Sequence, residues 1–267
     1  MNNNEKDKLY TIRWYNAKIE ERAGTHEVRD LARSQLLEIN KLLEGEGVTL
    51  PEEPERPSPY EEGKKLLYYP NATITAEKMP TQGTYHQNYP IGAVVHFTAG
   101  RSLKGDSDAI NTIRSGIANG YCYFCISNDG TVFQSFPLNR WGYHCGKSTW
   151  PGLGSGLSNK LVGIEICCAG KLDNNNTSWF GETYPANQTR IVGASGAREA
   201  GNYHKYTPQQ EASLIDLLVW LKKNNPDVFQ IENILYHEDI SPGRKNDPGG
   251  SISLSRIELQ DKIKGLL

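Results

Sequence analysis

Residues 93–100 read Ala-Val-Val-His-Phe-Thr-Ala-Gly, and the prediction of the fold starts from this stretch. Residues 93–97 are almost wholly apolar and end at a glycine-containing loop, which predicts a short buried strand. Side chains alternate along a strand, so His96 lies on the opposite face from Val95 and Phe97. Its position near the strand end lets the imidazole face a cleft. A hydrogen-bonded core histidine is the alternative for this residue taken alone.

The segments around this strand alternate between strand and helix patterns. Further strands are expected over residues 121–127, 131–136, 162–168 and 234–237, and helices over residues 107–115 and from residue 208 onward. Asn128-Asp129-Gly130 supplies a turn that joins the first two of these strands into a hairpin. Strands interleaved with helices predict an α/β fold with a mixed central sheet flanked by helices.

The clearest helix start is Thr207-Pro208-Gln209-Gln210. Threonine is a favoured N-cap, proline suits the first helical position, and glutamine three residues after the cap can complete a capping box. Leucines at 214, 217, 218 and 221 then form an apolar stripe at helical spacing. We expect this stripe to be buried and the helix to end before Pro226.

The N-terminal quarter of the chain has a different character. Residues 25–44 carry apolar side chains at helical spacing, and they must pack on the main domain, on another helix or on a partner chain. Residues 51–63 are rich in proline and acidic residues, as in an extended linker. We therefore expect a helical N-terminal segment (1–48), a Pro/Glu-rich linker (49–65) and a catalytic domain (66–267).

Composition excludes some classes of function. An apolar fraction of 37% is enough to bury a core, so global disorder is not expected. The formal net charge is -2 and there is no long basic run, so a nucleic-acid partner is not expected. No segment approaches the roughly 20 apolar residues of a membrane span, and the N-terminus lacks the apolar stretch of a secretory signal.

The five cysteines do not suggest a disulfide framework. Their number is odd and Cys167 and Cys168 are adjacent, which is typical of reduced thiols. Cys122 and Cys125 form a CxxC pattern that could serve metal or redox chemistry. No second CxxC accompanies it, and both cysteines lie in the predicted hairpin. Buried apolar thiols are therefore the favoured interpretation.

The second stretch that carries chemistry begins at Tyr236 and reads YHEDISPGRKNDPG. Its prolines and glycines constrain a loop that can bring His237 and Asp247 together. Two imidazoles and a carboxylate suit Zn²⁺, and three protein ligands leave a fourth position for water. The alternative is a polar surface loop in which Asp247 forms a turn with the following proline.

The third feature is Glu165, which lies within the apolar run Val-Gly-Ile-Glu-Ile of residues 162–166. An ionised carboxylate is costly to bury in an apolar strand unless it is paired or serves a function. A general base beside a metal site is one such function. A salt bridge to a neighbouring helix is the structural alternative.

Together these motifs resemble the type 2 family of N-acetylmuramoyl-L-alanine amidases. The resemblance rests on VVHFTAG around His96, VGIEI around Glu165 and HEDISPGRKNDPGG from His237, and it covers residues 80–267. The family includes phage lysins, peptidoglycan-recycling amidases and animal peptidoglycan recognition proteins. It implies a mixed central sheet flanked by helices, to which this chain adds a helical N-terminal extension.

The resemblance also implies roles for individual residues. His96, His237 and Asp247 match the zinc ligands, Glu165 matches the catalytic glutamate of the recycling branch, and Lys245 matches a lysine that helps to stabilise the oxyanion. The implied cofactor is Zn²⁺. The implied reaction is hydrolysis of the amide bond between the lactyl group of N-acetylmuramic acid and the L-alanine of the stem peptide.

Two further residues are candidates for substrate binding. His144 matches a family segment that lines the cleft, with a role as a fourth ligand as the weaker alternative. Arg244 is a candidate for binding a substrate carboxylate, although an arginine in such a loop more often braces the backbone.

The sequence departs from the family at Phe97, where many members have a second histidine. Residues 171–203 have no clear counterpart, and they form either one wall of the groove that holds the stem peptide or a mobile surface excursion.

These features predict a hydrolase that degrades the bacterial cell wall, and residues 79–101 resemble phage and prophage lysins in particular. The alternatives are a recycling amidase that acts on soluble anhydro-muropeptides and a non-catalytic peptidoglycan-binding module. We expect synthesis in the cytoplasm without a standard signal peptide, and action in the periplasm or cell wall after non-classical delivery. Peptidoglycan or a muropeptide is the expected partner, with a delivery or docking partner expected at the N-terminal helix.

Overall fold

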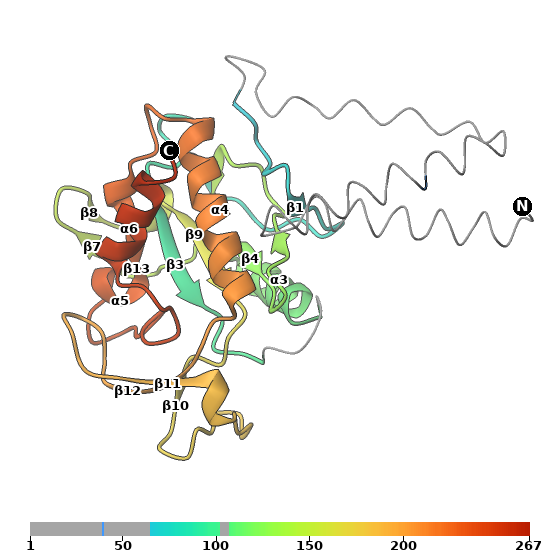
Figure 1. Cartoon of the computed structure of the whole chain (residues 1–267). Coiled ribbons are helices and arrows are strands. Elements are labelled where there is room, and N and C mark those ends of the chain that lie inside the picture. Colours follow the sequence, from blue (N-terminus) through green and yellow to red (C-terminus); the bar gives the residue numbers. More distant parts are fainter. Residues whose placement is uncertain (1–38, 40–64, 102–106) are drawn as a thin grey trace, which may run out of the picture. The chain divides into compact units, whose positions relative to one another are not determined.

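The computed structural model describes residue 39, residues 65–101 and residues 107–267 (Figure 1). A six-stranded sheet forms the centre of the described domain, in the order β1-β5-β4-β9-β3-β13. The strands are β1 (Ala72–Thr73), β3 (Ala93–Phe97), β4 (Phe124–Ile126), β5 (Val132–Phe133), β9 (Val162–Ile166) and β13 (Ile234–Tyr236). Strands β4, β9, β3 and β13 are parallel, whereas β4 and β5 form an antiparallel hairpin. The predicted mixed sheet is confirmed.

Side chains on the two faces of strand β3 pack into different apolar clusters. Val95 and Phe97 belong to the main apolar cluster, together with the leucines of helix α4 (Pro208–Asn224). Val94 belongs to a smaller cluster on the other face, with Leu157 and Leu235. His96 also lies on that second face because of the alternation along the strand. The face opposite α4 is therefore the one that carries the histidine.

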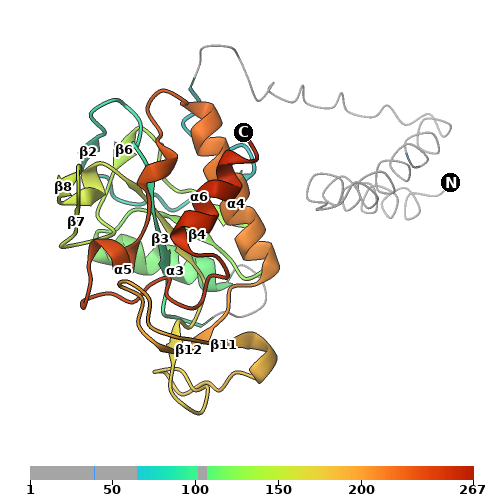
Figure 2. The same cartoon turned by 60° about the vertical axis from the view of Figure 1, so that its left-hand side comes forward.

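Helices cover both faces of the sheet. Helix α4 packs beside α6 (Arg256–Lys264), and the two lie next to each other in Figures 1 and 2. The predicted leucine stripe of α4 is wholly buried. Helix α3 (Ser107–Asn119) packs against β4. It extends past the predicted end at residue 115, and it stops at Gly120, whose φ of 76° is the left-handed conformation that ends helices.

The predicted strand at 234–237 ends one residue early. β13 stops at Tyr236, and His237 begins the short helix α5 (His237–Ile240). The amide of Glu238 donates a hydrogen bond to the carbonyl of Asp247 at 2.8 Å instead of joining a ladder. This bond folds the following loop back toward the strand end.

Residues 171–203 form a small sheet of their own. It comprises β10 (Lys171–Leu172), β12 (Gly201–His204) and β11 (Thr189–Val192), all antiparallel with β12 in the middle. Leu172 and Tyr184 form a separate apolar cluster beneath it, with Phe180 packed on them. Figures 1 and 2 show this sheet beside one end of the main domain. The segment is therefore an ordered subdomain with its own small core.

The remaining elements are short. Two-stranded pairs form between β2 (Gly83–Thr84) and β6 (Arg140–Trp141), and between β7 (Thr149–Trp150) and β8 (Gly154–Ser155). Single 3-10 turns lie at η1 (Leu157–Asn159), η2 (Ala186–Gln188) and η3 (Ile231–Asn233). All five cysteines are free and buried, as the interpretation of the CxxC pattern predicted.

The predicted N-terminal helix and linker lie outside the described residues, except for Ile39 and Lys65. Ile39 itself is helical and buried. The domain boundaries near residues 48 and 65 stay predictions. Within the part of the chain that is described, no helix has the length and apolar character needed to cross a bilayer.

The capping box of α4 gives a test of the fold. The Thr207 hydroxyl accepts a hydrogen bond from the amide of Gln210 at 3.1 Å and donates one to the carbonyl of Asn128 at 2.8 Å. Thr207→Ala removes both bonds, so we expect the free energy of unfolding to fall by about 1–2 kcal/mol in chemical denaturation. Thr207→Ser keeps the hydroxyl and should stay near wild type. Equal stability of the alanine variant would contradict this role of the cap.

Candidate metal centre and active site

The predicted ligands come from the ends of neighbouring parallel strands. Tyr236, the last residue of β13, is the register partner of Val95 in β3. His237 follows directly at the start of α5, and its ring centroid lies 4.4 Å from that of His96. Glu165 in β9 is the register partner of His96 on its other side. His96 and Glu165 share a face as register partners, and the ring contact with His96 brings His237 to the same face.

The loop after α5 adds a carboxylate to this group. Asp247 Oδ2 lies 2.9 Å from Nδ1 of His96 and 2.8 Å from Nδ1 of His237, and the two Nδ1 atoms are 2.8 Å apart. The exposed fraction is only 1% for His96, 5% for Asp247 and 2% for His237. The structure thus brings together all three residues that the sequence predicted as ligands.

Backbone carbonyls determine which ring nitrogens carry hydrogen. His237 Nε2 lies 3.0 Å from the carbonyl of Cys145, which can only accept. His144 Nε2 lies 2.9 Å from the carbonyl of Leu161, and His144 Nδ1 lies 3.1 Å from His96 Nε2. In the neutral rings, each Nε2 is therefore the donor: His96 donates to His144, and His144 donates to Leu161. The Nδ1 atoms of His96 and His237 therefore carry no hydrogen, and their lone pairs point at Asp247.

The electrostatics of the cluster agree with this assignment. Burial, reinforced by the neighbouring His237, lowers the pKa of His96 to about 4, so its imidazole is neutral at pH 7. Two nitrogen lone pairs and one carboxylate then face each other. The three residues could hold a metal ion, and this donor set suits Zn²⁺.

Glu165 lies next to this cluster and is not neutralised by a partner. Among the described residues, its buried Oε2 atom has no hydrogen-bond donor. Burial, with a smaller contribution from the charge of Asp247, raises the pKa of the Glu165 carboxyl well above its usual range. The Lys245 ammonium opposes this shift, so the lysine lies within electrostatic reach of the glutamate. No salt bridge to a helix, the structural alternative, is formed by this glutamate in the described chain.

Residues 86–250 match the family model described as N-acetylmuramoyl-L-alanine amidase. The matched range contains the three clustered residues as well as Glu165 and Lys245, and it covers more than half of the chain. The chain belongs to the N-acetylmuramoyl-L-alanine amidase family. The predicted family resemblance is confirmed.

Several solved amidase structures are similar in fold to this family member. A selenomethionine derivative of AmpD is 20% identical, with a TM-score of 0.47 over 72% of this chain and 96% of that one. The endolysin LysCS from Clostridium intestinale is 21% identical, with a TM-score of 0.42 over 74% and 98%. AmiD from E. coli, in complex with an anhydro-muropeptide, is 18% identical, with a TM-score of 0.42 over 69% and 61%. No curated protein sequence matches.

A cavity of about 470 Å³ reaches Glu165 from the surface of the amidase. Its walls come from the loop after β3 (residues 98–101), from α3, from Tyr121 and Tyr123 before β4, and from Trp179 of the small sheet subdomain. The cavity gives a substrate access to the glutamate beside the ligand cluster. Trp179 thus brings residues 171–203 to one wall of this cavity, and a contact of this segment with the stem peptide stays a prediction.

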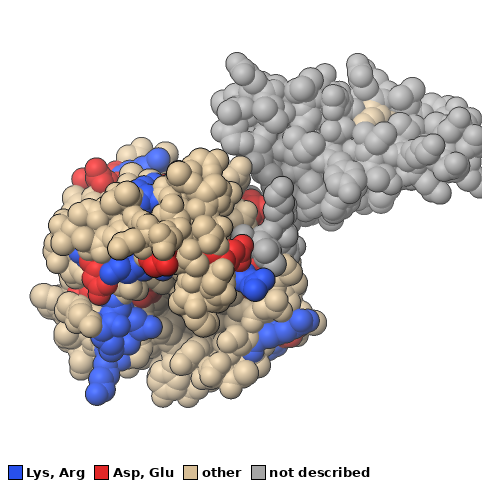
Figure 3. Space-filling view, turned by 90° about the horizontal axis from the view of Figure 1, so that it is seen from below, with Lys and Arg blue, Asp and Glu red and all other residues tan. Residues whose placement is uncertain are grey.

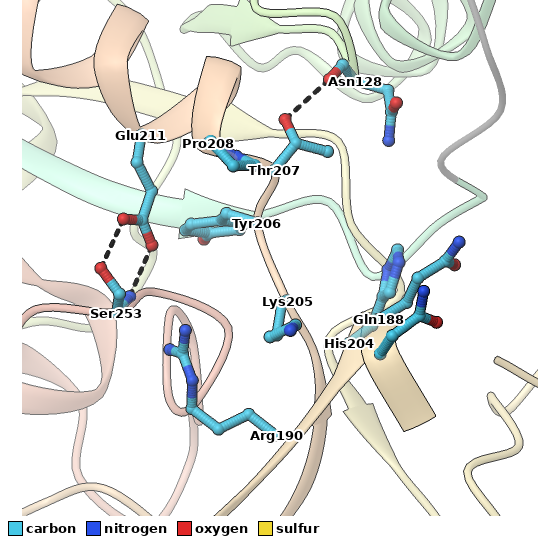
Figure 4. A pocket seen from close by; sticks show the side chains of 11 residues that line it. Asn128, Gln188, Arg190, His204, Lys205, Tyr206, Thr207, Pro208, Glu211 and Ser253 are labelled. Carbon is cyan, nitrogen blue, oxygen red and sulfur yellow. Dashed lines mark hydrogen bonds between the residues drawn. The ribbon is translucent and has the colours of Figure 1, made fainter. Parts of the chain in front are cut away.

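A second hollow, of about 650 Å³, lies between the small sheet and the start of α4 (Figure 4). It contains none of the predicted site residues. Arg190, His204 and Lys205 line it, and Glu211 is held there by Ser253, as the dashed lines in the figure show. This hollow is larger than the cavity at Glu165, but the ligand cluster and the glutamate lie elsewhere, so we do not assign the reaction to it.

Tyr206 connects the second hollow with the metal-ligand strand. It lines that hollow, and its hydroxyl donates a hydrogen bond to the carbonyl of His96 at 3.0 Å. This bond holds the backbone of a ligand residue. The sequence analysis missed Tyr206 because no spacing pattern relates it to His96, 110 positions away along the chain.

The two predicted substrate contacts have other partners in the structure. Both ring nitrogens of His144 are used, one by His96 and one by the carbonyl of Leu161. Arg244 Nη2 donates to the carbonyls of Cys145 and Lys147 at 2.8 and 2.7 Å, which is the bracing of the backbone that was the alternative for this residue. A contact of either side chain with substrate stays a prediction.

Phe97 turns away from the site. Its ring belongs to the main apolar cluster on the α4 face and contacts Gly170. The departure from the family at this position therefore leaves the ligand cluster unchanged.

Figure 3 shows small groups of basic and acidic side chains on one face of the domain, separated by uncharged surface. That face offers no continuous basic track for a nucleic acid.

The hydrogen-bond chain through His144 gives a test of the metal centre. His144→Ala removes the acceptor that fixes the tautomer of His96, so we expect the affinity for Zn²⁺ to fall about 10- to 100-fold in competition with a fluorescent chelator. Tyr143→Ala is the matched control, because this neighbouring side chain is 50% exposed and contacts none of the three ligands. Unchanged zinc affinity of the His144 variant, with the fold intact by circular dichroism, would contradict the tautomer assignment.

Proposed function

We propose that this chain is a zinc-dependent amidase that degrades the bacterial cell wall. It would hydrolyse the amide bond between the lactyl group of N-acetylmuramic acid and the L-alanine of the stem peptide. The observation that carries the proposal is the convergence of His96, His237 and Asp247 beside Glu165, in a chain that belongs to this amidase family. A module that only binds peptidoglycan needs neither a ligand cluster nor a buried, unpaired carboxylate.

The three clustered residues would hold the zinc ion. Bound there, zinc would supply a Lewis acid that makes water a nucleophile at neutral pH and polarises the scissile carbonyl. His237 is kept in the required tautomer by the carbonyl of Cys145, and His96 is kept so by His144. These neighbours orient the imidazoles before any ligand arrives, which reduces the reorganisation that binding requires.

Glu165 is the proposed general base and acid. Its carboxylate can accept a proton from the attacking water and then deliver it to the L-alanine nitrogen as the amide bond breaks. The raised pKa of this carboxyl makes it a better proton acceptor than an exposed glutamate. The ammonium of Lys245, which lowers the pKa of both Glu165 and His96, would stabilise the developing oxyanion.

The proposed substrate is the intact wall. The resemblance of residues 79–101 to phage lysins supports this choice, as does the wide cavity at Glu165. We likewise propose an antibacterial, lysin-like action in the periplasm or cell wall, reached by non-classical delivery with the N-terminal segment as a docking element. Rates on intact sacculi and on soluble anhydro-muropeptides would distinguish this activity from recycling. Faster turnover of the soluble compounds would overturn it.

Two variants separate metal binding from proton transfer. Glu165→Gln keeps the ligands and should bind Zn²⁺ normally, but its turnover should fall at least 100-fold because the proton acceptor is lost. Asp247→Ala should lose both zinc and turnover while the fold stays largely intact. The measurements are zinc content and mass spectrometry of digested sacculi, in which amidase action releases stem peptides with a free L-alanine amino group.

Full turnover of Glu165→Gln would show that the base assignment is wrong. Metal-free wild-type protein that binds sacculi without releasing stem peptides would favour the non-catalytic binding module. Lys160→Ala is a useful surface control, because its ammonium contacts the carbonyl of Leu153, away from the ligand cluster. It should match wild type in both zinc content and turnover.

A further inference from the structure

An exposed aromatic ring stands at the wall of the cavity that reaches Glu165. Trp179 is 78% exposed, yet it lines this cavity from the small sheet subdomain. Its indole Nε1 donates a 2.6 Å hydrogen bond to the carbonyl of Ala99, which lies three residues after His96. The ring is therefore fixed in orientation while its surface stays open to solvent. Its open face can therefore contact a ligand that enters the cavity.

The segment that carries Trp179 is built to present it. Ser178 and Gly181 close a turn around the tryptophan through a 2.9 Å backbone hydrogen bond, and Gly181 has a φ of 85°. Beyond the turn, the hydroxyls of Thr177 and Thr183 lie 2.9 Å apart. The turn's next residue, Phe180, anchors it by packing on the apolar cluster beneath the small sheet. These contacts fix the turn, so little conformational entropy is lost when a ligand meets the ring.

The chemistry of the cavity favours an uncharged polar ligand. Its described lining offers hydroxyl and amide groups from Asn111, Thr112 and Ser115 of α3 and from two tyrosines. The charged residues of the described lining are Arg101, Asp108 and Glu165. An N-acetylated sugar presents hydroxyls, an amide and an apolar ring face whose C–H groups complement the negative face of an indole.

We propose that Trp179 binds a sugar ring of the peptidoglycan glycan by stacking, and thereby selects substrates that carry the glycan. This inference rests on the proposed function, since it assigns the sugar side of the scissile bond to this wall. The ring would contribute binding energy away from the reacting atoms. Such an interaction changes KM and leaves kcat near its original value when it is equally strong in the ground and transition states.

The test measures binding without turnover. Two probes are titrated into the zinc-loaded protein by calorimetry: the disaccharide of N-acetylglucosamine and N-acetylmuramic acid with its lactyl carboxyl capped as the methyl ester, so that it is uncharged, and the free stem tetrapeptide. Trp179→Ala should weaken disaccharide binding about 10-fold and leave tetrapeptide binding unchanged. Trp179→Phe keeps a stacking face but loses the hydrogen bond to Ala99, so it should stay within about 3-fold of wild type. Ile191→Ala is the control, because this side chain is 81% exposed in the same subdomain but does not line the cavity.

Three results would overturn the inference. These are equal disaccharide binding by wild type and Trp179→Ala, weaker binding of the tetrapeptide in place of the disaccharide, and a loss in the phenylalanine variant as large as in the alanine variant. The last result would show that Trp179 only holds the loop after β3 in place, through its hydrogen bond to Ala99. If disaccharide binding depends on Trp179 but no stem peptide is released from sacculi, the proposed hydrolysis fails while the sugar site stands.

Discussion

The site depends on three hydrogen-bond acceptors that lie close together with no hydrogen atom between them. They are the Nδ1 atoms of His96 and His237 and the carboxylate of Asp247. Carbonyls of Cys145 and, through His144, of Leu161 accept the available imidazole hydrogens, so the lone pairs of His96 and His237 face the carboxylate of Asp247. Such a cluster is unfavourable in a buried site unless a cation lies between the acceptors. The three acceptors could therefore hold a divalent metal ion between them.

The parallel sheet is what makes this arrangement possible. Neighbouring parallel strands end at the same edge, so residues far apart in sequence meet there. His96 and Glu165 are register partners, and His237 follows one residue beyond β13. The proposed base thus stands beside the proposed metal on a rigid element, and only Asp247 and Lys245 come from a loop. That loop is itself held by Arg244, which donates to two carbonyls.

Much of the site could be predicted from the sequence because its residues lie in local motifs. His96, Glu165, His237 and Asp247 each lie in a short pattern with its own chemical signature, and alternation along β3 placed His96 on the correct face. The small sheet at residues 171–203 could not be predicted, because β10 is only two residues long and its pairing is set by tertiary contacts. The partners of His144 were missed for the same reason, since hydrogen bonds between distant segments leave no periodic signal.

X-ray absorption at the zinc K-edge of the purified full-length protein tests the central claim most directly. One zinc ion per chain should give a first shell of nitrogen and oxygen at about 2.0–2.1 Å, with the multiple-scattering signature of two imidazoles and no sulfur. The five buried cysteines make the absence of sulfur informative. A sulfur shell near 2.3 Å, or protein that takes up no zinc with His96, His237 and Asp247 intact, would contradict the account.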